Sequence, residues 1–230
     1  MNNKMNTRVN GALKLLALAA ALAVATGASA QSAGQWMAQV GLNKIEPDVK
    51  SGNVTAPALP ESRADIGADV QPVFTVGRML TDNISLELHL GVPYKHKIYG
   101  AGSLEGTGAL ATSEVLPPTL FAQYRLFKPD SVVRPYAGLG LTYAYFRNET
   151  GSGQLTALLN PGGPPATFSM QNKWAVAVQL GATVAINKQW FADVSVAKSK
   201  LKSTATYSTG QTMEARLDPL AVCIGIGYNF

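Results

Sequence analysis

The feature of this sequence that most constrains its fold is a strict alternation between apolar residues and small or polar residues. From Ile84 to Val92, every second residue is Ile, Leu or Val, and the residues between them are Ser, Glu, His and Gly. From Leu220 to Phe230, apolar residues alternate with Ala, Cys, Gly and Asn. A period of two places successive side chains on opposite faces of a β-strand. Because no segment after residue 30 shows a convincing helical stripe, the sequence predicts an all-β fold.

Eight segments follow this pattern and are separated by turn residues, which predicts eight strands. They are Gln35–Ile45, Val70–Leu80, Ile84–Pro93, Leu116–Phe127, Arg134–Phe146, Lys173–Ile186, Trp190–Lys202 and Met213–Phe230. Short connections follow the second, fourth and sixth strands. The connections after the first, third and fifth strands are long and contain the loop-like stretches Gly52–Pro60, Gly100–Gly108 and Gly151–Pro165. Short periplasmic turns and long outer loops are typical of outer-membrane barrels, so we expect an eight-stranded antiparallel up-and-down transmembrane β-barrel.

The two faces of the strands distinguish a membrane barrel from a soluble one. A soluble barrel buries its apolar face, but here the other face carries glycines, which cannot fill a core. We therefore expect the glycine face to line a cramped interior and the apolar face to contact lipid. The glycines either relieve crowding or leave a narrow passage. Those on the inward face are Gly41, Gly77, Gly91, Gly138, Gly140, Gly181, Gly225 and Gly227.

Residues 1–30 have the pattern of a signal peptide. Basic residues without any acidic one precede an apolar run, Leu15–Ala25, and Ala28-Ser29-Ala30 fits a small-residue cleavage site. The run is shorter than the roughly 20 residues of a membrane-spanning helix, although an uncleaved anchor is the alternative. We expect a signal peptide at 1–30 and an outer-membrane β-barrel at 31–230.

Charge and cysteine content exclude several classes of function. Three of the 19 Lys and Arg residues lie in the leader, which leaves 16 against 14 Asp and Glu and a net charge of +2 in residues 31–230. No basic cluster is long enough to indicate nucleic-acid binding. The single cysteine, Cys223, excludes an intrachain disulfide, and with two histidines it argues against a His/Cys metal cluster. We expect no cofactor.

Aromatic residues lie near the ends of the predicted strands, as interfacial girdles require. Scattered strand-forming aromatics are the alternative. Tyr228 and Phe230 end the chain on the lipid face, which is typical of substrates of the barrel-assembly machinery. The girdle candidates are Trp36, Tyr124, Phe127, Tyr143, Tyr145, Trp174, Trp190, Tyr228 and Phe230.

Several motifs, spread in order over most of the chain after the leader, give it a family resemblance. They are Thr81-Asp82-Asn83-Ile84 with Glu87-Leu88, Pro93-Tyr94-Lys95-His96-Lys97-Ile98, Leu116-Pro117-Pro118-Thr119-Leu120 with Ala122-Gln123, Arg134-Pro135-Tyr136 with Gly138 and Gly140, Ile186-Asn187 with Trp190, and Arg216-Leu217-Asp218-Pro219 with Gly227-Tyr228 and Phe230. The sequence resembles the OmpW family of outer-membrane proteins, which includes the alkane-uptake protein AlkL.

The resemblance implies a barrel in the bacterial outer membrane whose apolar channel passes small hydrophobic molecules by diffusion. Family members often narrow this channel with bulky apolar side chains, but His89 and Ala197 stand at two such positions here. The expected partners are membrane lipid, the barrel-assembly machinery and small hydrophobic solutes. Residues expected to line the lumen are Glu87, His89, Phe121, Arg125, Asp193 and Ala197.

Inside the lumen, Glu87 and Arg125 both point inward by strand parity, near the periplasmic ends of neighbouring strands. Charges in a narrow barrel must be paired or hydrated, so we expect them to pair, with Asp193 nearby. The pair would form either a structural polar plug or a selective pore ring.

His89 also points inward, away from the lipid-facing sites of outer-membrane enzymes, so no enzyme activity is expected.

Three prolines suggest where a hydrophobic solute could leave. Pro93 ends the third predicted strand, and Pro117 and Pro118 open the fourth. Since proline lacks the N–H that a sheet ladder needs, a lateral opening between these strands is one hypothesis. The alternative is that the prolines only end the strands. Two other functions stay open at this point: a structural or adhesion barrel whose outer loops bind external partners, and a soluble periplasmic ligand-binding barrel.

Overall fold

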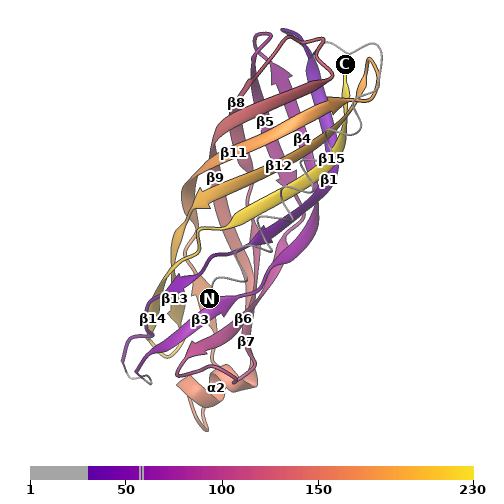
Figure 1. Cartoon of the computed structure of the whole chain (residues 1–230). Helices are drawn as coiled ribbons and strands as arrows, with labels where there is room; N and C mark the ends of the chain where they lie inside the picture. The colour runs from indigo at the N-terminus through magenta and orange to yellow at the C-terminus, as the bar shows by residue number, and fades with distance from the viewer. Residues whose placement is uncertain (1–30, 57, 59) are drawn as a thin grey trace, which may run out of the picture.

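The computed structural model describes residues 31–56, 58 and 60–230, and the expected signal peptide lies outside them. Eight strands in this part of the chain close into an antiparallel barrel, in which each strand pairs with two neighbours (Figure 1). The ring closes where β9 pairs with β11, so the predicted fold class is confirmed. In sequence order the barrel strands are β1 (Trp36–Glu46), β4 (Asp69–Met79), β5 (Ile84–Gly91), β8 (Thr119–Arg125), β9 (Val133–Gly151), β11 (Lys173–Ala185), β12 (Trp190–Lys200) and β15 (Leu220–Asn229). None of the helices in the described residues is both long enough and apolar enough to span a membrane.

The two ends of the barrel differ. The short turns predicted after the second, fourth and sixth strands lie together with the C-terminus, at the upper end of Figure 1. Side chains cap these turns: Thr81 Oγ1 accepts from the Ile84 amide, and Asn187 Oδ1 accepts from the Trp190 amide. Backbone bonds between Trp36 and Phe230 join the first and last strands at this end. In the outer-membrane barrel that the sequence predicts, this is the periplasmic end.

The predicted faces are confirmed along every barrel strand. Outward-facing apolar side chains are exposed on the isolated chain, as a lipid-facing wall requires, while the inward face carries small and polar residues together with a few buried large side chains such as Phe121 and Phe191. Aromatic side chains border this wall at both ends: Trp190 contacts Tyr228 at the periplasmic end, and Trp174, 69% exposed, contacts Tyr143 at the other. These pairs have ring centroids 5.0 and 4.9 Å apart.

Several inward glycines make room for aromatic rings. A Cβ atom built on Gly140 would lie 2.5 Å from the Phe121 ring, and one on Gly227 would lie 2.1 Å from the Phe191 ring. At Gly181, a Cβ would meet the ring of Tyr136 at 2.4 Å. These three glycines therefore relieve crowding and do not leave an open passage.

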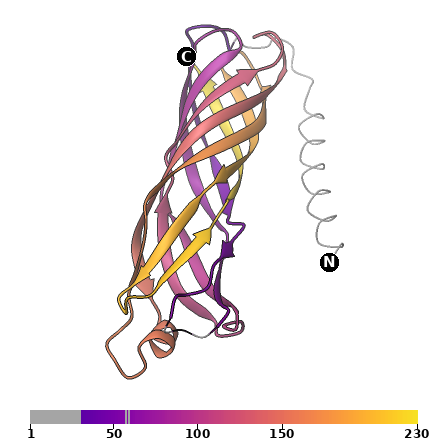
Figure 2. The ribbon, with the colours of Figure 1, turned by 90° about the vertical axis from the view of Figure 1, so that its left-hand side faces the viewer.

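Beyond the outer aromatic residues the barrel continues as an extension, which corrects the expectation of long loops. The extension contains β2 (Lys50–Ser51), β3 (Ser62–Ile66), β6 (Tyr94–Gly102), β7 (Ala109–Leu116), α2 (Gly153–Leu159), β10 (Phe168–Met170), β13 (Lys202–Tyr207) and β14 (Thr212–Arg216). Strands β3, β6 and β7 continue the barrel sheet beside the C-terminal part of β9, while β10, β13, β14 and β2 form a second sheet. Figure 2 shows α2 at the tip.

Two elements of the extension differ from the sequence prediction. The eighth predicted strand, Met213–Phe230, is two strands, because the chain bends at Asp218, whose φ is 27°. The bend is fixed by Asp218 Oδ1, which accepts from the Leu201 amide at 3.0 Å. The short helix α2 is also new: its N-cap Ser152 accepts from the Leu155 amide, and Leu155 packs into the apolar core of the extension.

Candidate functional site

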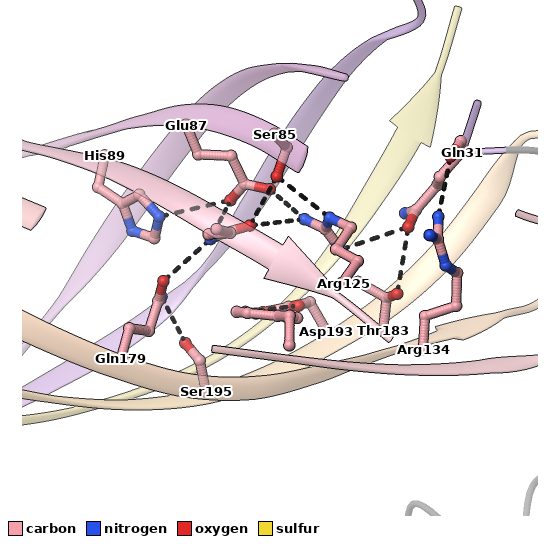
Figure 3. A network of polar contacts seen from close by, with 12 residues as sticks. Gln31, Ser85, Glu87, His89, Arg125, Arg134, Gln179, Thr183, Asp193 and Ser195 are labelled. Atoms are coloured by element: carbon pink, nitrogen blue, oxygen red, sulfur yellow. Dashed lines mark hydrogen bonds and ion pairs between the residues drawn. The ribbon is translucent and has the colours of Figure 1, made fainter. Parts of the chain in front are cut away.

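A network of polar side chains crosses the lumen near its periplasmic end (Figure 3), and Arg125 is its centre. The Arg125 side chain is 1% exposed and forms an ion pair with Glu87. Its guanidinium also donates to Gln123 Oε1 at 2.8 Å, and its Cζ lies 4.8 Å from the centroid of the Tyr136 ring. The protein therefore compensates this buried cation with an ion pair, a hydrogen bond and an aromatic ring, as burial of a charge requires.

The network spans the barrel from β5 to β12. Glu87 accepts from Gln123 Nε2 at 3.0 Å, and the same amide donates to Gln179 Oε1 at 2.9 Å. Gln179 in turn donates to Ser195 Oγ at 3.3 Å. Asp193 joins through Tyr136, whose hydroxyl lies 3.0 Å from its Oδ2. The sequence placed Asp193 beside the charged pair, and the structure shows that the contact runs through Tyr136.

A second layer closes the periplasmic end. Arg134 is buried and donates to the backbone carbonyls of Gln31 and Asp82. The Gln31 side chain accepts from Arg125 Nη1 and from Thr183 Oγ1, both at 3.3 Å. We call these two layers together the polar plug. Arg134 was not among the residues expected in the lumen, although it shares the inward parity of Tyr136 and Gly138.

On the outer side of the polar plug lies an apolar cavity of about 130 Å³, here called the lumen cavity. His89 and Phe121 lie at its floor with ring centroids 5.1 Å apart, and Ala197 lines its wall. His89 also faces the plug, since its Nε2 is 3.6 Å from Glu87 Oε2. The six residues expected in the lumen thus divide into two groups, with Glu87, Arg125 and Asp193 in the plug and the other three around the cavity.

A smaller apolar cavity of about 60 Å³ lies in the extension. Ile66, Ile98 and Met170 line both cavities, so these three side chains separate them. The two cavities are therefore neighbours, separated by uncharged side chains.

The three prolines interrupt the barrel wall beside the lumen cavity. Strands β5 and β8 pair from Ile84 as far as His89, opposite Thr119, and pairing resumes between β6 and β7 at Tyr94, opposite Val115. Strand β5 ends at Gly91 and β8 begins at Thr119, so strands do end at the prolines, and β6 and β7 resume the pairing beyond them. Between the two ladders, the facing segments Leu90–Pro93 and Leu116–Pro118 form no pairing with each other. We call this interruption the wall gap.

The family model of the OmpW family matches residues 32–230. The chain belongs to the OmpW family. Outer membrane protein W of Vibrio cholerae serotype O1 is 31% identical over 219 residues, which cover 94% of this chain and 97% of that protein. Outer membrane protein AlkL of Ectopseudomonas oleovorans is 26% identical and covers 86% of this chain and 83% of its own length.

Solved structures agree with this assignment. The crystal structure of the outer membrane protein OprG from Pseudomonas aeruginosa matches with a TM-score of 0.78 and 26% identity, and covers 88% of this chain and 99% of that one. This OmpW-family chain is accordingly a bacterial outer-membrane β-barrel protein. The hypothesis of a soluble periplasmic barrel is wrong.

Proposed function

We propose that this barrel is a passive channel that admits small hydrophobic molecules from outside and releases them sideways into the outer membrane. The observation that carries the proposal is the lumen cavity itself, which is apolar, closed by the polar plug on its periplasmic side and bordered by the wall gap in the barrel wall.

The polar plug disfavours a route to the periplasm. A hydrophobic solute would have to displace Gln123 and Arg125 from their hydrogen bonds, and leaving a buried charge unpaired costs several kcal/mol. Water beyond the plug is also a poor destination, because each CH₂ group removed from water is favoured by about 0.8 kcal/mol. The lipid beside the barrel offers the solute an apolar environment without either cost.

The wall gap supplies the sideways route. Pro93, Pro117 and Pro118 lack the N–H groups that would donate across it. Leu90 is 42% exposed on the outer wall and also lines the lumen cavity, so at this residue the cavity lies directly behind the outer surface. Opening it requires side-chain movement and does not break ladder hydrogen bonds.

A relative's name supports an apolar solute. The dibenzothiophene metabolism operon protein PahQ of Pseudomonas aeruginosa is 27% identical and covers 85% of this chain. Its name associates that protein with the metabolism of an apolar aromatic compound.

The experiment cross-links the two sides of the wall gap. Cysteines at Val92 and Leu116, with Cys223→Ser, would be bridged by oxidation or by a short thiol cross-linker. Cells that oxidise n-octane internally report its uptake. We expect the oxidation rate to fall toward that of cells lacking the protein when the bridge forms, and to recover on reduction of the disulfide. A matched control bridges Ala182 and Val194, which are directly opposite each other on the fully paired strands β11 and β12. Unchanged uptake with the Val92–Leu116 bridge complete would rule out this exit.

A further inference from the structure

The wall of the lumen cavity carries a pair of polar side chains outside the polar plug. His96 on β6 and Ser113 on β7 are directly opposite each other in the ladder, and both line the cavity. Directly opposite residues of an antiparallel pair share one face, with Cβ atoms about 5 Å apart. The two side chains therefore present their polar atoms to the same part of the cavity.

The Ser113 hydroxyl is a buried polar group without a partner. Ser113 is 6% exposed, and its Oγ has no hydrogen bond within the described chain. Other hydroxyls around the same cavity are satisfied: Thr119 and Thr142 bond to each other at 2.8 Å, and Ser195 accepts from Gln179. Because an unsatisfied buried hydroxyl is costly, Ser113 is placed to donate to something that enters the cavity.

His96 supplies the complementary acceptor. Its Nδ1 lies 2.7 Å from the Gly67 carbonyl oxygen, and since a carbonyl can only accept, Nδ1 carries the proton. Nε2 of the neutral ring is then a lone-pair acceptor. Burial lowers the pKa of His96 below its ordinary value of 6.5, against smaller opposing effects from the hydrogen bond to Gly67 and the charge of Asp69, so the ring is neutral near pH 7.

We propose that Ser113 and His96 bind the hydroxyl group of an amphipathic solute, such as a medium-chain alcohol or a phenol, whose apolar part fills the lumen cavity. A hydroxyl can accept from Ser113 Oγ and donate to His96 Nε2 at the same time. An ether or ketone would leave Nε2 unpaired, and a carboxylate would face the lone pair of Nε2. An alkane would leave both groups unpaired.

His96 and Ser113 lie next to the wall gap, which is the exit of the proposed channel. Tyr94, two residues before His96, follows Pro93 directly, and Ser113 precedes Leu116 by three residues. A bound alcohol would thus be held by its polar end beside the exit. This inference names the solute class of the proposed channel and rests on that proposal for how the solute arrives and leaves, but the binding site can be tested alone.

The test measures binding of radiolabelled 1-octanol, octyl methyl ether and n-octane to the folded chain in lipid nanodiscs, with empty nanodiscs subtracted. We expect Ser113→Ala to weaken 1-octanol binding about fivefold, the effect of losing one hydrogen bond of average strength, and to leave n-octane binding unchanged. His96→Phe should act in the same direction, and Ser113→Thr, which keeps the hydroxyl, should retain binding. Ser199→Ala, at another serine lining the cavity, is the matched control.

Two results would overturn the site: equal binding of 1-octanol by the Ser113→Ala variant and the unmodified chain, or an equal loss for 1-octanol and n-octane. Retained heat-modifiable migration shows that each variant is folded. The proposed channel fails in a different way, namely if uptake by cells does not depend on the protein while Ser113-dependent binding persists.

Discussion

The ring of Phe121 lies over Gly140 of the neighbouring strand so closely that a methyl group at Gly140 would be 2.5 Å from its Cδ1. The two residues are directly opposite each other in the pairing of β8 with β9. We predict that Gly140→Ala forces the ring toward the lumen cavity and destabilises the barrel by about 1–3 kcal/mol, as overpacking does. Urea unfolding in lipid vesicles measures the loss. Gly153→Ala is the control, since a Cβ there meets nothing within 4 Å. Equal stability of the two variants would contradict the prediction.

Arg125→Leu should be strongly destabilising because it leaves Glu87 buried without its cation. Removal of one partner of a buried ion pair costs about 3–5 kcal/mol. The double variant Glu87→Leu with Arg125→Leu should recover part of this loss, although Gln123 also loses its bond to Arg125. A double-mutant cycle from unfolding in lipid vesicles measures the coupling. If the single and double variants are equally destabilised, the two charges do not stabilise each other.

Deletion of Phe230 should lower the amount of barrel assembled in the outer membrane. Phe230 is 64% exposed on the lipid side, so its loss leaves no cavity in the folded wall. The proposed effect is on recognition by the barrel-assembly machinery. Heat-modifiable protein in outer-membrane fractions measures it. Phe127→Ala, which removes another exposed aromatic ring from the same end, controls for general loss of lipid contacts. Wild-type amounts of folded protein after the deletion would show that the signal lies elsewhere.

Acidification should loosen the junction between the barrel and the extension. The pKa of His96 is lowered in the fold, so the fold favours neutral His96. Its stabilising contribution is complete above the ordinary value of 6.5 and is lost as the pH falls below it. Asp69 stays ionised in this range: although burial opposes it, hydrogen bonds from Gln71 and the Lys95 amide keep its pKa below 3.8. Faster amide hydrogen exchange along β6, corrected for the intrinsic effect of pH, is the expected result. His96→Phe should abolish the acceleration, and an unchanged protection pattern in the unmodified chain would refute it.

The barrel could be predicted from the sequence because its strands are half exposed to lipid and half to the lumen. Because of that asymmetry, apolar residues alternate with small or polar residues in segments such as Ile84–Val92. The extension escaped prediction because it does not contact lipid, so its strands need no uniformly apolar face. Segments such as β6, with the sequence Tyr-Lys-His-Lys-Ile-Tyr, carry polar residues on both faces. The glycines and serines of the extension are also common in loops, so its strands were predicted as loops.

The site was predictable only in part. Strand parity and charge were enough to predict that Glu87 pairs with Arg125, because charges inside a narrow barrel must be paired or hydrated. Parity alone could not show that Gln123 bridges Glu87 to Gln179, since this depends on which side chains meet across the lumen. The cavity was equally hidden, because its volume follows from the sizes of side chains that come from many different strands.

Gln31 links the polar plug to the expected cleavage of the signal peptide. It is the residue at which the sequence predicts that the leader is cut, and it lies buried among Arg125, Arg134 and Thr183. If the cut falls there, the chain terminus produced by the protease is itself a component of the plug. Cleavage one residue further along would then remove an acceptor from each of two buried arginines, Arg125 and Arg134, so the position of the cut and the closure of the lumen depend on one glutamine.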